Sequence, residues 1–236
     1  MRDVVFLVAD ATMQQTLQGF FGRKEFHRSV CCSAFEIDAR LNHDVFVASG
    51  DNDSGLYARP DELLRPHHST HRRAVIMLDA DWDGSPGAAD ILSGVSTRVA
   101  RVWRPEDMAV IVLEPEIEAW FWQPDNPHVA TAMNYRGERH YREVLTSAGY
   151  WPDDHPKPPR PKEALEYMRR TYRTDFSPPS CAVPPSTSPS VAAATRRSEH
   201  CVTRCAVGFR RRADENRRRT RRRTRNGAEN CRCPRA

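Results

Sequence analysis

The chain has 236 residues and a formal net charge of +5 at pH 7, a length that suits one or two domains. Charge is divided sharply, because residues from Ser177 onward hold 15 Arg, no Lys and four acids, a net of +11, which leaves −6 on residues 1–176. No apolar run approaches the roughly 20 residues that span a bilayer, and the N-terminus lacks a signal-peptide pattern, so we expect a cytoplasmic protein without a membrane partner.

The first part of the chain alternates strand and helix patterns. Val4 to Val8 is an unbroken apolar run typical of a buried parallel strand. A helix capped by Thr12 is expected to run to about Phe21. The pattern then predicts strands at about 29–37 and 45–48, a loop at 50–55, and a helix at 56–64 that is interrupted by Pro60.

The middle of the chain continues the alternation. Five apolar residues, 74–78, lead into Asp79 and predict a buried strand. A helical pattern over 87–102 and another apolar strand over 108–113 follow, and Pro115 suits the first turn of a further helix. Strands alternating with helices predict an α/β, Rossmann-like fold with a mostly parallel sheet flanked by helices.

The composition changes toward the C-terminus. We expect an α/β domain over 1–150, a Pro-rich linker (151–161) and a helix (162–174) within 151–176, and a disordered Arg-rich tail over 177–236. The tail has two interpretations. It is a nucleic-acid-binding arm, since arginines near phosphates release counterions, or it is an out-of-frame translation of GC-rich coding sequence, since Lys is absent and the change is abrupt.

Acidic residues follow three of the expected strands. Asp10 comes after the first, Asp79, Asp81 and Asp83 after the central one, and Glu114, Glu116 and Glu118 after the later one. Because parallel strands end at one edge of a sheet, these carboxylates can converge. Carboxylates are typical Mg²⁺ or Mn²⁺ ligands, and the candidate metal ligands are Asp79, Asp81, Asp83, Glu114 and Glu118. The alternatives are a solvated acidic turn after the central strand, and first-turn residues that satisfy backbone amides for Glu116 and Glu118.

A second cluster of potential ligands is less convincing. His67, His68 and His71 lie in a polar stretch with several arginines, where histidines are more often solvated than metal-bound. No phosphate-binding Gly-rich loop is present in the sequence.

The order of these acidic elements resembles a known group. Asp10 after the first strand, Asp79-Ala80-Asp81, and Glu114-Pro115-Glu116-Ile117-Glu118-Ala119-Trp120 together look like the Toprim-like proteins of unknown function found near prokaryotic defence genes, over about residues 3–176. The resemblance implies Mg²⁺ bound by Asp79 and Asp81, with Asp10, Asp79 and Asp81 as the catalytic acids. It also implies a metal-dependent nuclease acting on DNA or RNA, with other defence-system proteins as partners.

One position departs from the family pattern. The family has Glu-Gly after the first strand, and this chain has Asp10-Ala11, whose acid is one methylene shorter and whose alanine lacks the backbone freedom of glycine. A catalytically degenerate scaffold or sensor subunit of a defence complex is therefore the alternative function. A phosphatase with an aspartyl nucleophile is disfavoured, because such enzymes place their Asp-x-Asp pair after the first strand.

Overall fold

A parallel sheet forms the centre of the N-terminal part of the molecule, which we analyse in a computed structural model that describes residues 1–24, 26–29, 35–38, 43–48 and 52–175. The four strands are β1 (Val5–Val8), β2 (Val45–Val47), β3 (Ala74–Asp79) and β4 (Met108–Leu113). They lie in the order β2-β1-β3-β4, and every neighbouring pair is parallel. The expected α/β class with a mostly parallel sheet is confirmed.

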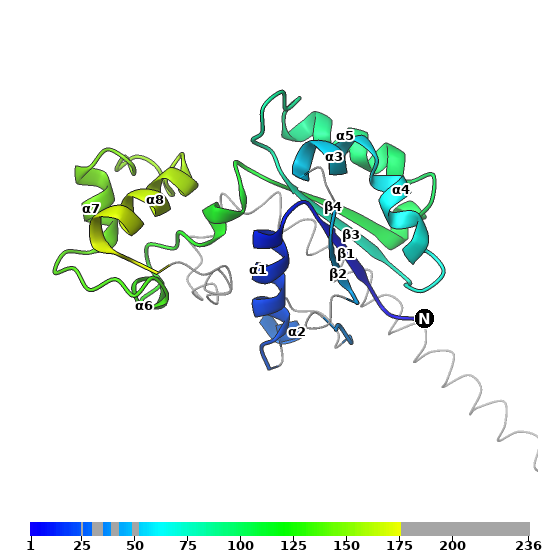
Figure 1. Ribbon diagram of the computed structural model, residues 1–236, viewed down its shortest axis with the longest axis horizontal. Coiled ribbons are helices and arrows are strands. Elements are labelled where there is room, and N and C mark those ends of the chain that lie inside the picture. Colours follow the sequence, from blue (N-terminus) through cyan, green and yellow to red (C-terminus); the bar gives the residue numbers. More distant parts are fainter. Residues whose placement is uncertain (25, 30–34, 39–42, 49–51, 176–236) are drawn as a thin grey trace, which may run out of the picture.

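Helices cover both faces of this sheet (Figure 1). One face is covered by α1 (Ala11–Phe21) beside α2 (Phe26–Ser29), and the other by α3 (Asn52–Ala58), α4 (Pro60–Leu64) and α5 (Ala88–Val99). This division follows from right-handed crossovers, because the connection after β1 runs one way across the sheet and the later connections run the other way. Two short 3₁₀ helices, η1 (Arg65–His67) and η2 (Pro105–Asp107), precede β3 and β4.

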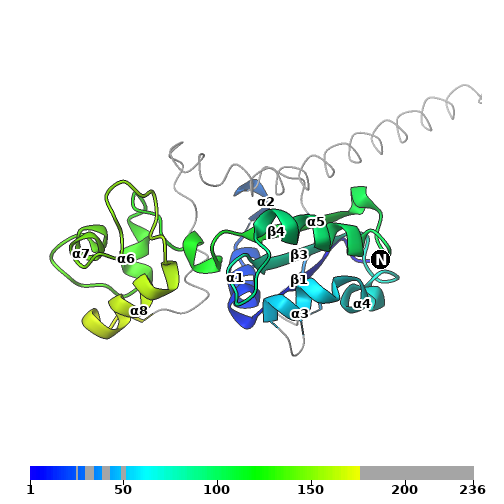
Figure 2. The same cartoon turned by 90° about the horizontal axis from the view of Figure 1, so that it is seen from above.

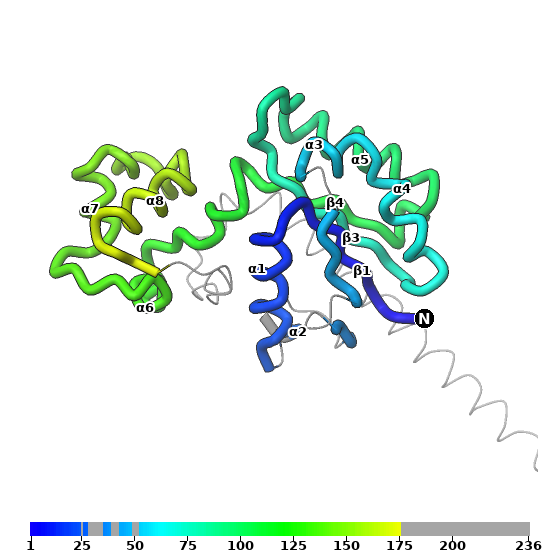
Figure 3. Tube along the Cα trace, in the orientation of Figure 1, coloured from blue at the N-terminus to red at the C-terminus, as the bar shows by residue number. Residues whose placement is uncertain are grey.

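Beyond β4 the chain forms a second group of helices. The 3₁₀ helix η3 (Ile117–Trp120) leads to α6 (His128–Ala132), α7 (Tyr141–Ser147) and α8 (Pro161–Tyr172). Figures 2 and 3 show these three helices gathered beside the sheet, on the side toward which the strands run. We call residues 1–120 the sheet unit and residues 121–175 the helical unit.

The two units have separate apolar cores. The core of the sheet unit is formed mainly by the strands and by the inward faces of α1, α3, α4 and α5. The core of the helical unit is rich in aromatic residues, with Phe121, Trp122, Tyr141 and Trp151 almost fully buried. Residues 121–150 therefore pack with residues 151–168, although the sequence groups them with the sheet.

Four local expectations differ from the structure. Asp10, not Thr12, caps α1, because its side chain accepts the backbone N–H of Met13. The expected loop at 50–55 contains the start of α3, and the expected strand at 29–37 is absent from 35–38, its other residues lying mostly outside the described part. The expected extended linker is anchored by Trp151, which is buried and donates its indole N–H to the carbonyl of His155. The tail after residue 177 lies outside the described residues.

A polar cluster around the buried Asp44 joins the amino-terminal ends of the strands. Asp44, directly before β2, accepts hydrogen bonds from Arg2 and contacts His71 at 3.0 Å, and the other ring nitrogen of His71 lies 2.9 Å from the hydroxyl of Thr70. His67 instead stacks on Phe46. These histidines therefore stabilise the edge of the sheet opposite to the acidic strand ends.

Candidate functional site

The strand order creates a switch point between β1 and β3. From β1 the chain moves to β2 on one side, and later strands are added on the other side, so the carboxyl ends of β1 and β3 flank the crevice where open α/β sheets place ligands. Asp10 follows β1 and Asp79 is the last residue of β3. This edge of the sheet faces the helical unit (Figure 1).

Asp79 is the most strongly perturbed acid at this edge. Its side chain is 7% exposed, and within the described part of the chain its Oδ1 atom has no hydrogen-bond partner although it is buried. The pKa of Asp79 is raised to about 9, mainly by burial and then by the nearby carboxylates Asp53, Glu118, Asp10 and Glu116, in that order. We call these five acids the acid cluster. A carboxyl group in this environment is neutral at pH 7 unless a cation joins it.

Asp53 was missed by the sequence analysis, which placed it in a loop. It lies in the first turn of α3, after Asn52, whose backbone is left-handed (φ 47°). Its Oδ1 accepts the backbone N–H of Asp79 at 2.7 Å. Burial raises the pKa of Asp53, and the hydrogen bond from Asp79 partly offsets that increase. Because Asp53 also follows a strand, the rule that selected the other acids could have found it.

Glu118 lies in η3 and, like Asp79, is a predicted metal ligand that belongs to the acid cluster. It is 9% exposed, and burial raises its pKa, while Lys162 on α8 acts in the opposite direction. The neighbouring Glu116 accepts the backbone N–H of Lys162 at 2.8 Å. Glu116 thus satisfies a backbone amide, as the alternative interpretation held, but the amide belongs to α8 and not to its own helix.

Asp10 contributes charge to the cluster while serving the fold. Its Oδ1 accepts the Met13 amide at 2.8 Å, which fixes the side chain at the N-terminus of α1. Its carboxylate nevertheless lies close enough to raise the pKa values of Asp53, Asp79 and Glu118. Capping by Asp is itself stabilising, because the helix N-terminus carries partial positive charge.

The remaining candidate ligands do not join the cluster. Asp81, Asp83 and Glu114 are exposed, and none of them is among the groups that act on Asp79. The strand ends at Asp79, and the backbone N–H groups of Ala80 and Asp81 turn toward the carbonyl of Pro115. The two acids of the Asp-x-Asp motif consequently lie in different environments, Asp79 inside and Asp81 on the surface.

Two lysines from the helical unit approach this region, and the sequence analysis had singled out neither. The charge of Lys162 lowers the pKa values of Asp53 and Glu118. Lys157 donates from Nζ to the carbonyl of Ala119 in η3 at 2.7 Å, and burial lowers the pKa of Lys157 to about 8. The acidic edge of the sheet is therefore partly supported by cations from the other unit.

A pocket of about 680 Å³ opens between the two units beside the acid cluster. Asp81, Pro115 and Glu116 form its wall on the sheet unit, and residues of α8 with Tyr150 form the opposite wall. Asp81 therefore lies on the rim of a pocket, whereas the carboxylate of Asp79 is buried.

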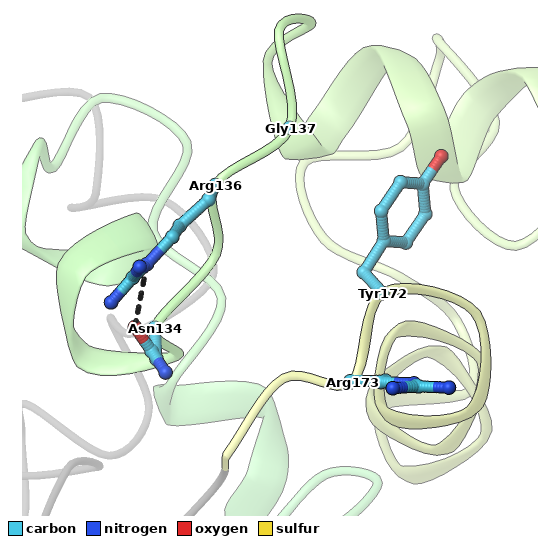
Figure 4. Close-up of a pocket in the computed structure, with 5 residues that line it drawn as sticks. All are labelled: Asn134, Arg136, Gly137, Tyr172 and Arg173. Atoms are coloured by element: carbon cyan, nitrogen blue, oxygen red, sulfur yellow. Dashed lines mark hydrogen bonds between the residues drawn. The ribbon is translucent and has the colours of Figure 1, made fainter.

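A second pocket of about 440 Å³ lies within the helical unit, far along the chain from the acids (Figure 4). Arg136 is turned toward Asn134, with 3.2 Å between Nε and Oδ1, and Arg173 points to the other side. Because the two guanidinium groups do not converge, this pocket receives no functional assignment.

The acids do not form a finished metal site as they stand. Within the described residues, no group of three or more His, Cys, Asp or Glu side chains is arranged to hold a metal ion. The donor set still fits a hard divalent cation chemically, because it offers carboxylate oxygens, one of which is buried without a partner.

The comparisons with known proteins give no match. No protein-family model, no curated protein sequence and no solved structure is similar enough to this chain to be matched. In the described part of the molecule, no helix has both the length and the apolar character needed to cross a membrane.

Proposed function

We propose that this chain is a Mg²⁺- or Mn²⁺-dependent phosphoryl-transfer enzyme, a Toprim-like nuclease that cleaves DNA or RNA within a prokaryotic defence system. One observation carries the proposal: the buried, unpartnered carboxylate of Asp79 stands at the switch point of the sheet among four further acids. The resemblance of the Asp79–Asp81 and Glu114–Trp120 elements to Toprim-like proteins supports the nuclease and the defence setting.

A cation resolves the electrostatic conflict at this position. Carboxylates that share a site repel one another, and a buried acid is protonated when nothing compensates its charge. Asp79 and Glu118 would be the main ligands, since they are the two buried acids of the cluster, with Asp53, whose pKa burial also raises, beside them. A bound divalent ion would supply charge stabilisation to the phosphoryl group and lower the pKa of a water molecule.

The other residues of the site have supporting roles in this proposal. Asp10 contributes negative charge but is held by its capping bond to Met13, so we do not make it the general base. Asp81, on the rim of the pocket, would meet the substrate or its associated cations instead of binding the buried ion.

Calorimetric titration of the full chain with Mn²⁺ tests the proposal. We expect wild type to bind Mn²⁺, Asp79→Asn to lose binding, and the matched control Asp83→Asn to keep it, because Asp83 is exposed and outside the cluster. Binding should also release about one proton at pH 7, because ligands must be deprotonated. That proton is measured from the dependence of the binding enthalpy on the buffer. Equal binding by wild type and Asp79→Asn would remove Asp79 from the site.

A catalytically degenerate scaffold is the second candidate. Two observations favour it: no ready three-ligand group exists among the described residues, and Asp10 is engaged in capping a helix. A folded wild-type protein that neither binds Mn²⁺ nor cleaves single-stranded or duplex substrates would establish this alternative.

A further inference from the structure

The pocket between the units has a wall made by one face of α8. Its sides combine two tyrosines, Tyr150 and Tyr167, with the cationic side chains of Arg160, Lys162 and Arg170 and with the carboxylates of Glu163 and Glu166. The volume of about 680 Å³ lies in the range typical of pockets for small ligands, roughly 300–1,000 Å³. Neither the acid cluster nor the fold of the sheet explains this combination of groups.

The tyrosines form an aromatic platform. Their ring centroids are 4.8 Å apart with an interplanar angle of 31°, and both side chains are half-buried, so the rings are held against the core of the helical unit and still reach the pocket. Every nucleobase has a π-face, and stacking on tyrosine needs an unpaired base. The platform therefore suits a single strand better than a duplex.

The cations of α8 are positioned for phosphates. Arg160 and Arg170 are oriented by exposed ion pairs with Glu163 and Glu166 of the same helix, at 3.3 and 2.7 Å. Exposed pairs of this kind are weak and easily exchanged, so a phosphate can compete for the guanidinium groups. Lys162 lies nearest the sheet unit, since its charge acts on Asp53 and Glu118.

The opposite wall brings the acids of the sheet unit to the same space. Asp81, Pro115 and Glu116 line it, and Glu116 belongs to the acid cluster. A nucleic-acid strand that places a base on the tyrosines and a phosphate on the α8 cations therefore has its sugar-phosphate backbone beside the proposed cation site.

We propose that this pocket binds one nucleotide unit of a single-stranded nucleic acid, with its base stacked on the outer face of the Tyr150–Tyr167 pair and its phosphate at Arg160, Lys162 and Arg170. The inference rests on the proposed function, for which it names the substrate class and the orientation. The group that the pocket recognises is an unpaired base joined to a phosphodiester, which both DNA and RNA contain.

Fluorescence anisotropy on the full chain in EDTA tests the inference. The probes are a short labelled oligothymidylate, a matched oligouridylate and a duplex of the same length. We expect Tyr167→Leu to weaken binding of the single strand by about tenfold or more, the usual effect of losing one stacked base, and Tyr167→Phe to keep it. The tail arginines attract any polyanion but are the same in every variant, so the differences report on the pocket.

The matched control is Tyr172→Leu. Tyr172 lies on the same helix and is also half-buried, but its ring contacts Tyr135 and lines the other pocket. We expect it to leave binding unchanged, and circular dichroism melts of all variants establish that each is folded. Preference for one oligonucleotide identifies DNA or RNA as the source.

Three results would overturn the inference: no loss with Tyr167→Leu, an equal loss with Tyr172→Leu, or duplex binding that depends on Tyr167 as strongly as single-strand binding does. Because EDTA removes divalent ions, the outcome is independent of the acid cluster. Failure here removes the nucleotide pocket, whereas failure of the Mn²⁺ titration removes the proposed enzyme.

Discussion

The sheet unit and the helical unit treat buried polar groups in opposite ways. All four buried side-chain atoms that lack hydrogen-bond partners in the described residues belong to the sheet unit, on Arg23, Asp79 and Trp103. In the helical unit the buried indole of Trp122 donates to Pro161, and the hydroxyl of Tyr141 donates to Gln123. Unsatisfied buried groups are costly, and a bound ion is one of the causes that account for them in native proteins.

In the helical unit, by contrast, the buried polar groups named above have hydrogen-bond partners. Its core packs Trp122 against Trp151 at 5.8 Å in an edge-to-face arrangement. Such a core can hold one wall of a pocket while the acids of the sheet unit form the other. Buried polar atoms without partners thus lie at one end of the described chain, and the well-paired aromatic core lies at the other.

The largest expected effect is in the aromatic core. Trp122→Ala should destabilise the helical unit by about 3–5 kcal/mol, because a fully buried large side chain is lost. Hydrogen exchange measures the consequence: amides of the helical unit should lose protection, while those of β1 and β3 should keep theirs. Equal loss of amide protection in both units would mean that they unfold as one cooperative body, which would contradict the division into two units.

Replacing Asp79 by a side chain that cannot ionise should stabilise the protein. With a pKa of about 9 in the folded state against 3.8 for the ordinary group, the folded protein binds more protons between these values, and wild-type stability falls as pH rises from about 4 to 9. Asp79→Asn removes this penalty, so we expect a gain of up to about 4 kcal/mol at pH 7 and little gain at pH 4. Urea unfolding across this pH range checks the slope.

The control for this prediction is again Asp83→Asn. Because Asp83 is exposed in a turn, its substitution should leave the pH dependence as in wild type. An Asp79→Asn profile parallel to that of wild type would show that Asp79 is ionised normally.

The ionisation of Lys157 should change stability with pH in the direction opposite to that of Asp79. Its pKa falls from 10.5 to about 8 on folding, so the unfolded state binds more protons between these values and stability rises as pH increases from about 8 to 10. Lys157→Met should abolish this rise, which we expect to be on the order of 2 kcal/mol. Lys24→Met, at an exposed position, serves as the control and should retain the rise in urea unfolding experiments.

The smallest effect concerns a single satisfied group in the helical unit. Tyr141→Phe removes the 2.7 Å hydrogen bond to the Gln123 carbonyl and leaves that acceptor buried. A loss of about 1–2 kcal/mol is expected, measured by urea unfolding. A neutral result would show that water replaces the hydroxyl, and that the helical unit is less tightly satisfied than its contacts indicate.

The sequence predicted the strands well because parallel strands buried on both faces are unbroken apolar runs, as in Val5–Val8 and Met108–Leu113. It also predicted that Asp79 and Glu118 lie near each other, since acids that follow parallel strands meet at one edge. Trp151 shows what composition hides: proline content predicted an extended linker, but one large apolar side chain fixes the segment in a core.

Two features of the site were missed when the sequence was read. Asp53 depends on a helix that begins at a left-handed asparagine inside an apparent loop. Asp81 would share the side of Asp79 if the strand continued, because side chains alternate with period two. The strand ends at Asp79, so the alternation no longer applies and the second acid turns to the surface.

The hydrogen bond from the Lys162 amide to Glu116 spans 46 residues of sequence. The chain therefore leaves the sheet unit at η3, forms almost the whole helical unit, and returns at α8 to nearly the point where it left. Segments whose ends lie close together tolerate changes of length and insertions. The segment between η3 and α8 can therefore lengthen or shorten around α6 and α7, while the pocket between the two units keeps both walls.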